Sequence, residues 1–292
     1  FKNEYVAIPS VEEQRIIADF LDQKTSEIDN LIADKKRLIE LLEEKRQAII
    51  TETVTKGLDP EVEMKDSRIE WLGNIPKHWK IERLKQSIKL SKNGIWGNDE
   101  QQDENDIYCI RIADFNRKNY EVDFKDGFTL RNLNQNKQKE YQLKKGDLLL
   151  EKSGGGDKQP VGFVAQYNLD ETAIYANFMS KISLYRNKAD SNFFKYLFGT
   201  LYLYRVNIRS IKQTTGIQNL DTSLYFNEKI PLPPLEEQKR ISKYIYEELK
   251  KIDEVINDIQ IQINRLKEYR QSLIYEAVTG KIDVRDYPLE RK

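Results

Sequence analysis

The sequence predicts an α+β protein in which one mixed α/β domain is flanked by two long helices that form an antiparallel coiled coil. The first observation behind this prediction is a helical stretch that occurs twice, at residues 9–57 and 233–281, with a constant offset of 224 positions and no gap. The second is the segment between the two copies, which combines short strand patterns with one helical stretch. Internal repetition constrains an architecture before any local pattern does.

The two copies share identical residues along their whole length. Glu12, Glu13 and Gln14 match Glu236, Glu237 and Gln238; Ile28 and Asp29 match Ile252 and Asp253; Arg46 and Gln47 match Arg270 and Gln271; Val54 and Thr55 match Val278 and Thr279. Because the spacing never changes, we expect both copies to take the same structure from end to end.

Apolar residues form a narrow helical stripe in each copy. In the second copy, at alternating spacings of three and four, they are Ile241, Ile245, Leu249, Ile252, Ile256, Ile259, Ile263 and Leu266. In the first, Leu21, Ile28, Leu42 and Ile49 fall at heptad spacing, with Leu31, Leu38, Ile32 and Ile39 beside them. So narrow a stripe is typical of a coiled-coil seam. Helices of roughly 65–70 Å with such a seam need a partner, and the other copy, packed antiparallel, is the expected one.

The ends of the predicted helices carry capping signals. Ser10 and Glu13 have the spacing of a capping box, and Gly57 lies where a C-terminal cap is expected. The second copy opens on Pro233 and Pro234, which suit a first turn that needs no amide donors.

Composition excludes several classes of protein. The charged fraction is 33%, the hydrophobic fraction is 39% and the formal net charge is zero, so there is no global basic signature. Residues 60–230 hold 27 Lys and Arg against 23 Asp and Glu, a mild positive excess. Cys109 is the only cysteine, which excludes an intramolecular disulfide and a cysteine-rich metal site. No apolar run reaches the roughly 18 residues of a membrane span, and a reducing cytoplasm is the expected location.

These patterns divide the chain into five segments. Residues 1–10 are expected to be the tail of a preceding, absent domain, because Asn3, Glu4 and Val6 align with Asn227, Glu228 and Ile230. The first long helix is expected at 11–57, the inserted domain at 58–231, the second long helix at 232–282 and a C-terminal tail at 283–292.

The insert opens with a compact segment at residues 70–79 that holds two tryptophans and His78, the only histidine. A structural or surface role for His78 is favoured over a catalytic one, because no acidic or nucleophilic partner can be assigned. Strands are expected at residues 107–112, 120–124, 147–150, 161–165 and 180–185, and a helix at residues 192–205.

Three polar loops supply candidate nucleic-acid contacts. They are residues 91–98 with Lys92, Asn93 and Trp96; residues 152–160 with Lys152, Ser153 and Lys158; and residues 205–219 with Arg209, Lys212, Gln213, Thr214 and Gln218. Glycines at 154–156 bring bare backbone amides close to an anion, and amide side chains hydrogen-bond base edges or phosphates. A simple turn at 152–160 and a solvated face at 205–219 are the alternative interpretations.

Signals of catalysis are missing from the sequence. No Gly-Lys-Ser/Thr opens a helix after the glycine-rich loop, no Gly-x-Gly-x-x-Gly follows a strand, and there is no His-Glu-x-x-His. We therefore predict no catalytic residue, no metal site and no cofactor. Two alternatives stay open: a coiled-coil adaptor with a protein-binding insert, and a metal-dependent nuclease that uses Asp147 and Glu151.

The chain resembles the specificity subunit of type I restriction-modification enzymes. The residues that carry the resemblance are the Pro-x-x-Glu-Glu-Gln start of the second helix and the related start of the first; Trp71-Leu72-Gly73-Asn74-Ile75-Pro76 with Trp79; Gly146-Asp147-Leu148-Leu149; Lys152-Ser153-Gly154-Gly155 with Pro160-Val161-Gly162; and Gln213-Thr214-Thr215-Gly216-Ile217-Gln218-Asn219-Leu220. The likeness covers essentially the whole chain.

The resemblance implies a non-catalytic subunit whose two target-recognition domains each read one half of a bipartite site in double-stranded DNA. It also implies that the helices space those domains and dock the methyltransferase subunits, with a restriction subunit in the same complex. This chain departs from the pattern because it holds both helices but one recognition domain. It is expected to be either a piece of a full subunit or a half-length form that pairs with a second copy through its helices.

Overall fold

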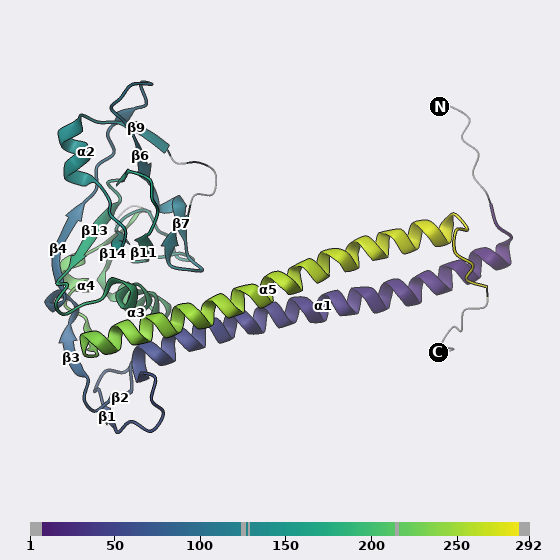
Figure 1. Ribbon diagram of the computed structural model, residues 1–292, viewed down its shortest axis with the longest axis horizontal. Helices are drawn as coiled ribbons and strands as arrows, with labels where there is room; N and C mark the ends of the chain where they lie inside the picture. The colour runs from purple at the N-terminus through teal and green to yellow at the C-terminus, as the bar shows by residue number, and fades with distance from the viewer. Residues whose placement is uncertain (1–7, 124–126, 128, 214–215, 286–292) are drawn as a thin grey trace. The chain divides into compact units, whose positions relative to one another are not determined.

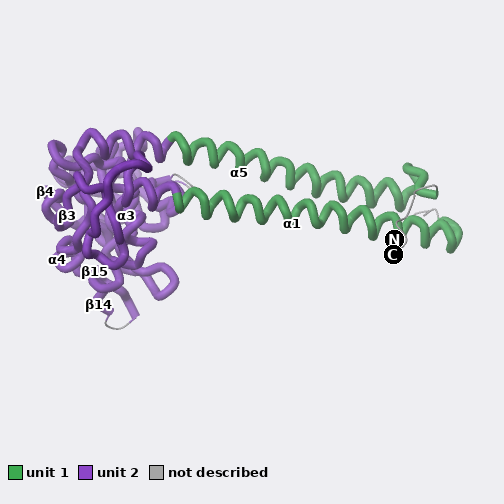
Figure 2. Tube along the Cα trace, turned by 90° about the horizontal axis from the view of Figure 1, so that it is seen from below, with its two compact units in different colours: residues 1–48, 247–292 green, residues 49–246 purple. Residues whose placement is uncertain are grey.

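The computed structural model describes residues 8–123, 127, 129–213 and 216–285. The chain divides into two compact units, coloured separately in Figure 2. One unit is residues 1–48 with 247–292, and the other is residues 49–246. Among the described residues, no helix is both long and apolar enough to cross a membrane.

Two long helices, α1 (Val11–Lys56) and α5 (Leu235–Val278), match the two copies of the repeat. The predicted capping box is present, because the Ser10 backbone N–H donates to Glu13 Oε2 at 3.0 Å and the Glu13 N–H donates to Ser10 Oγ at 3.3 Å. Gly57 follows α1 with a positive φ of 80°, which an L side chain rarely adopts, so the helix ends there.

Within the first unit the two helices run side by side, as Figures 1 and 2 both show. Lys35 Nζ donates to Gln262 Oε1 at 2.6 Å, and Arg270 Nε lies 3.1 Å from Asp29 Oδ1. The residue numbers on α5 rise as those of the contacting residues on α1 fall, so the two helices are antiparallel, as predicted.

The seam between these helices is apolar and follows the predicted stripe. Buried seam residues of this unit include Ile28, Ile32, Ile259 and Ile263. Leu31 and Leu38, which were expected beside the seam, are 49% and 46% exposed. Each immediately precedes a seam residue, and one residue along a helix turns the side chain by about 100°, which carries both leucines onto the outer surface.

The unit of residues 49–246 is built on two main sheets. The six-stranded sheet has the order β4 (Ile88–Asn93), β13 (Met179–Leu184), β10 (Asp147–Glu151), β11 (Val164–Tyr167), β8 (Glu121–Val122) and β7 (Phe115–Asn116). The four-stranded sheet has the order β12 (Ala173–Tyr175), β6 (Asp106–Ile110), β9 (Thr129–Asn132) and β5 (Asn98–Asp99).

Smaller elements complete this unit. Three two-stranded sheets pair β1 (Met64–Asp66) with β2 (Asn74–Pro76), β3 (Lys80–Arg83) with β16 (Lys229–Leu232), and β14 (Ile211–Gln213) with β15 (Gln218–Leu220). The short helices are α2 (Gln135–Tyr141), α3 (Ser191–Leu203), α4 (Thr222–Tyr225) and the 3-10 turns η1 (Leu84–Gln86), η2 (Ile112–Asp114) and η3 (Val206–Ser210).

Helix α3 forms the centre of the core. Phe193, Phe194, Leu197 and Phe198 are fully buried, so the helix is apolar on most of its surface and packs against β10 and β11. Its N-cap is Asp190, whose side chain accepts a hydrogen bond from the Phe193 N–H at 2.9 Å.

The five expected strands and the expected helix all correspond to observed elements, but two expected loops contain regular structure. Strand β4 runs into the predicted loop at 91–98, because its backbone pairs with β13. The predicted loop at 205–219 contains η3 and the β14–β15 hairpin. In the first loop a polar composition concealed pairing with a distant strand, and in the second it concealed a local hairpin.

The repeated Glu-Gln pair fastens the first turn of α5 to the rest of its unit. Glu237 accepts from Trp79 Nε1 at 3.1 Å and lies 2.8 Å from His78 Nε2. The buried Gln238 accepts from the Asp190 N–H at 2.9 Å and donates to the Lys188 carbonyl at 3.0 Å. These contacts give His78 the structural role that the sequence favoured.

Candidate nucleic-acid interface

The first two predicted loops meet at one end of the six-stranded sheet, where β10 and β4 end and β13 begins. The register places Glu151 beside Met179 and Ser180 beside Asn93. Lys152 Nζ and Ser180 Oγ both donate to Asn93 Oδ1, at 2.7 and 2.8 Å. A lysine and an amide from loops that are 59 residues apart therefore share one hydrogen-bonding cluster.

The third predicted loop joins the same end of the sheet through the β14–β15 hairpin. Ser153 and Asn219 form an isolated β-bridge, and the Ser153 hydroxyl donates to Asn219 Oδ1. The Leu220 N–H donates to the Lys152 carbonyl at 2.8 Å, and the Gly154 N–H donates to the Gln218 carbonyl at 3.1 Å. The glycine-rich loop is thus held by backbone pairing to the hairpin.

Glycine has different roles in the two loops. A Cβ on Gly94 would lie 2.2 Å from the Ala176 carbonyl oxygen, so only glycine allows the two backbones to pack this closely. By contrast, nothing lies within 4 Å of a Cβ placed on Gly154 or Gly156. There is open space beside these two glycines, but their amides are not bare as the sequence suggested: the Gly154 N–H donates to the Gln218 carbonyl and the Gly156 N–H donates to the Gln159 carbonyl at 3.0 Å.

Besides Asn93, the exposed predicted residues are Lys158, Arg209, Lys212 and Gln213. Lys212 Nζ lies 2.6 Å from Asp221 Oδ2, but its side chain remains 72% exposed. Thr214 lies outside the described residues. These side chains lie on the glycine-rich loop, on η3 and on the hairpin, so their charges and amides are available on the surface around this end of the sheet.

Gln218 has a different position from the one that the sequence suggested. It is 5% exposed, and its Oε1 accepts from the Val161 N–H at 3.3 Å. Its side chain is therefore occupied in holding the glycine-rich loop against the hairpin, and we assign it to positioning that loop.

Lys92 and Trp96 face other parts of the unit. Lys92 Nζ lies 3.0 Å from Glu140 Oε1 and 4.0 Å from the centre of the Tyr141 ring, because alternate residues of a strand point to opposite faces. The Arg131 guanidinium stacks on Trp96 at 3.8 Å. The structure therefore brings Asn93, but not these two residues, into the cluster around Lys152.

An ion pair between a half-buried arginine and a buried glutamate supports the base of the glycine-rich loop. Arg117 Nη2 lies 2.7 Å from Glu151 Oε2, and the guanidinium also lies 4.5 Å from the centre of the Phe163 ring. Burial raises the pKa of the Glu151 carboxyl above its ordinary value, although Arg117 opposes that effect. Burial also lowers the pKa of Lys152. Sequence reasoning missed Arg117 because nothing in its local pattern distinguishes it from a surface arginine.

Phe178 is a second residue that sequence reasoning missed. It is 52% exposed, and its carbonyl accepts from the N–H groups of Lys152 and Ser153 at 2.9 and 3.2 Å. It therefore lies beside the glycine-rich loop with much of its ring uncovered. Its surroundings in the sequence, between β12 and β13, gave no signal of a binding role.

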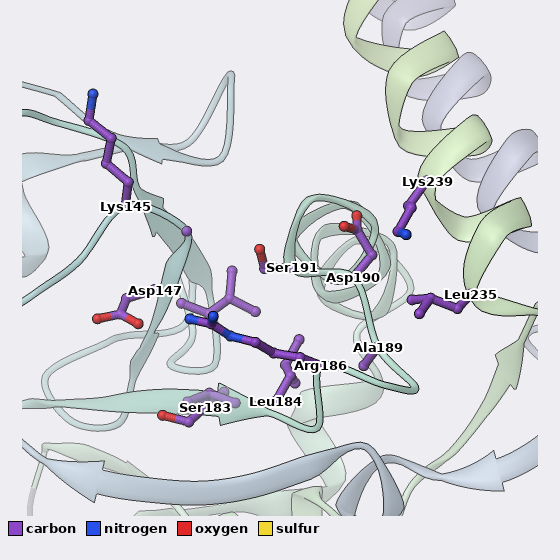
Figure 3. Close-up of a pocket in the computed structure, with 13 residues that line it drawn as sticks. Lys145, Asp147, Ser183, Leu184, Arg186, Ala189, Asp190, Ser191, Leu235 and Lys239 are labelled. Carbon is purple, nitrogen blue, oxygen red and sulfur yellow. The ribbon is translucent and has the colours of Figure 1, made fainter.

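The opposite end of strands β10 and β13 borders a polar pocket of about 380 Å³. Figure 3 shows the Arg186 side chain extending between Asp147 and Ser191. Asp147 is held there by Lys181 at 3.3 Å. It is at one end of the five-residue strand β10 and Glu151 is at the other, roughly 13 Å apart at 3.3 Å per residue. Two carboxylates at that separation cannot ligate one metal ion, which argues against the nuclease alternative.

The described residues form a mixed α/β domain in which basic and amide-bearing loops gather at one sheet end, and the same chain carries a long antiparallel helical pair. This combination is that of a nucleic-acid recognition protein. Residues 76–265 match the type I restriction modification DNA specificity domain. The chain belongs to this family.

Two curated relatives are similar to almost the whole of this chain. The chain is 28% identical over 291 residues to the MjaVIII specificity subunit of Methanocaldococcus jannaschii, covering 98% of this chain and 64% of that protein. It is 25% identical over 281 residues to the StySPI specificity subunit of Salmonella potsdam, covering 95% and 57%. The chain therefore spans about three fifths of the length of these relatives, both of which are named as specificity subunits of type I restriction enzymes.

Two solved structures share the fold. A chain from work on complex assembly and conformational transition of the type I R-M system superposes with a TM-score of 0.65 at 18% identity, covering 95% of this chain and 62% of that chain. The HsdS subunit from Thermoanaerobacter tengcongensis gives 0.51 at 16% identity, covering 95% and 60%. At these identities the likeness concerns the fold, and it includes the combination of long helices with a mixed domain.

Proposed function

We propose that this chain reads one half of a bipartite site in duplex DNA for a type I restriction-modification system, through the domain at residues 58–231. The observation that carries the proposal is the convergence of the three loops around Lys152, Asn93 and Ser153. The proposed contribution of this chain is DNA recognition, and catalysis belongs to partner subunits. Since the proposed ligand is DNA and the proposed partners are methyltransferases, the location that we propose is the cytoplasm.

Two kinds of contact follow from the chemistry of the exposed side chains. Lys158, Arg209 and Lys212 carry positive charge into solvent and suit phosphates, which fix register without reading sequence. Asn93 and Gln213 carry amides, which suit base edges in the major groove. Asn93 is already bonded to Lys152 and Ser180, so its orientation is set before DNA arrives.

Half-site reading implies a second recognition domain, and the repeat supports a place for one. Leu232 is 5% exposed, whereas its repeat equivalent Ile8 is 81% exposed. Likewise, Val54 is fully buried, whereas its repeat equivalent Val278 is 57% exposed. Gln238 is fully buried, whereas Gln14 is exposed. The helix ends near Ile8 and Val278 thus expose positions that the other ends cover, as expected if a second domain of the same design docks there.

Docking of methyltransferase subunits is the second part of the proposal, with the restriction subunit joining through them. Four exposed apolar or aromatic residues support it, each immediately before a seam position. They are Leu31, Leu38, Val255 and Tyr269, which are individually 46–57% exposed. In an antiparallel pair, the same heptad position of both helices lies along one side, so these residues form one face. A face of this kind suits further helices, and pairing with a second copy of the chain is the alternative occupant.

The test of DNA recognition is selection from a pool of random duplexes by the 292-residue chain, followed by binding measurements at several salt concentrations. We expect enrichment of a short sequence and a linear fall of log K with log salt. Lys158→Ala should weaken binding to all sequences and reduce the salt slope by about 0.9. Gln213→Ala should relax preference at particular bases.

A protein-binding adaptor would give a different result. It would show no salt-dependent affinity for DNA, whether or not methyltransferase subunits were added, and no enrichment from the random pool. Either finding would overturn the proposed function.

A further inference from the structure

The side chain of Phe178 is exposed beside the loop cluster, and none of the contacts described above gives it a role. Among the described residues, it is the only phenylalanine with more than a third of its surface exposed. The exposed tyrosines of the same unit keep a hydroxyl that water can bond, whereas a phenylalanine ring has no polar group. Scattered exposed apolar residues are common, so its meaning depends on where the backbone holds it.

The backbone holds Phe178 in a tight turn with support on two sides. The turn closes through the Met179 N–H, which donates to the Ala176 carbonyl at 3.1 Å. On one side Gly94 packs against the Ala176 carbonyl, and the Gly94 N–H donates to Met179 O at 3.0 Å. On the other side, Lys152 and Ser153 donate their N–H groups to Phe178 O. The turn therefore bridges the loop at 91–98 and the glycine-rich loop.

The surroundings of the turn combine charge, an amide and exposed apolar side chains. Lys152 supplies a cation, Asn93 supplies an amide that the buried Ser180 hydroxyl helps to hold, and Phe178 supplies the apolar surface of the turn itself, with the exposed Ile217 on the neighbouring hairpin. Duplex DNA presents a matching combination in its major groove, where phosphates and polar base edges surround one apolar group, the C5-methyl of thymine. A rigid aromatic ring loses little conformational entropy when it makes such a contact.

We infer that Phe178 is a specificity-determining residue that contacts the C5-methyl group of a thymine in the half-site. This inference rests on the proposed function. About half of the Phe178 surface is covered by its own unit, so the ring is not free as a whole to insert between base pairs. A methyl contact fits that degree of exposure better than a wedge does.

The experiment starts from the duplex selected by the 292-residue chain and replaces each thymine in turn by uracil, which removes only the methyl group. At one position we expect the wild-type affinity to fall about fourfold, the value of one buried methyl-sized group. Phe178→Ala should bind the thymine duplex correspondingly more weakly, be indifferent to uracil at that position, and keep the wild-type salt slope because no charge is removed.

Tyr185→Ala is the matched control, because Tyr185 is a similarly exposed aromatic residue (45%) just beyond the other end of β13. It should keep both the affinity and the response to uracil. Thermal unfolding of the two variants should shift by similar small amounts, since both side chains are about half exposed.

The possible outcomes distinguish a failure of the proposed function from a failure of the inference about Phe178. If the wild type selects no sequence, the proposed function fails and this inference fails with it. If the wild type selects a site but Phe178→Ala binds and discriminates uracil as the wild type does, only the inference is wrong. A selected site without any thymine would also overturn the methyl contact. So would unstacking of a 2-aminopurine probe that depends on Phe178, because it would show that the ring inserts between base pairs as a wedge.

Discussion

Arg46 on α1 is 4% exposed, and its guanidinium pairs with the carboxylate of Asp253 on α5. The repeat relates this pair to a second one, Arg270 with Asp29, because both arginines and both aspartates are 224 positions apart. Each helix therefore contributes one arginine and one aspartate to the two ion pairs, as an antiparallel arrangement requires. A shift of either helix by one turn would break both pairs, so together they define the register of the helical pair.

Reversing the charge of Arg46 tests this register. Arg46→Glu places two carboxylates together, and we expect it to lower the free energy of unfolding by about 2–3 kcal/mol, below the loss for a fully buried pair because Asp253 is half exposed. Adding Asp253→Arg should recover part of the loss. Arg37→Glu is the control: the ion pair of Arg37 with Glu40 is exposed on both sides, so the free energy of unfolding in urea should change little.

Gln238 and Gln14 are repeat equivalents that test how α5 is fastened to its unit. Both donate to the carbonyl of a proline five residues earlier, at 2.9 Å, but only Gln238 also bonds Asp190 and Lys188. Gln238→Ala leaves the buried Asp190 N–H without its acceptor and should cost about 2–3 kcal/mol in urea unfolding. Gln14→Ala should cost less than about 0.5 kcal/mol, and equal costs for the two variants would contradict the assignment.

The pair of Arg117 and Glu151 makes a prediction about pH. Arg117→Met leaves the Glu151 carboxylate, whose side chain is 3% exposed, without a cation, and should cost about 3 kcal/mol at pH 8. The folded-state pKa of Glu151 is raised above its ordinary value. Folding therefore favours the protonated form, and that contribution to stability is present below the unfolded pKa and is lost as the pH rises through the folded pKa.

Removing Arg117 raises the folded pKa of Glu151 further, so the cost of Arg117→Met should shrink as the pH falls through that value. The measurement is urea unfolding of wild type and variant from pH 8 down to about pH 4.5. Glu151→Gln in the Arg117→Met background should recover most of the loss at pH 8. A penalty that stayed the same at every pH would show that the loss comes from packing alone.

Gln218 and Gln213 separate loop positioning from base reading. Gln218→Ala removes the acceptor of the buried Val161 N–H, so we expect a loss of about 1–3 kcal/mol in stability and faster hydrogen exchange at the Val161 amide. Gln213→Ala removes an exposed side chain and should leave stability unchanged while altering base preference. If Gln218→Ala were as stable as the wild type, its bond to the glycine-rich loop would have no positioning role.

Much of the fold was predictable because its signals are local. The capping residues Ser10 and Glu13, the apolar stripe through Ile259 and Ile263, and the apolar helix after Asp190 each depend on spacing within a few turns. The rotation of Leu31 out of the seam was missed, because apolar character alone does not tell a seam position from the position before it. The short helix α2, with no buried residue, also gave no periodic signal.

The candidate site was predictable in composition but not in arrangement. The sequence identified Lys152, Ser153 and Asn93 as loop residues with suitable chemistry, and all three lie in one cluster. It could not distinguish Gln213 from Gln218, since their different exposure depends on pairing between the hairpin and the glycine-rich loop. It gave no reason to consider Phe178, whose position depends on hydrogen bonds from residues 25 and 26 positions earlier.

By itself, the sequence determined that two equivalent helices pair antiparallel and that a mixed domain with polar loops lies between them, because periodicity and repetition are properties of the chain alone. Only the tertiary structure decided which loop side chains face solvent, which are held inside, and which aromatic ring is left uncovered beside Lys152. The physical reason is that exposure at this end of the sheet follows from hydrogen bonds between strands distant in sequence, and no local pattern encodes those partners.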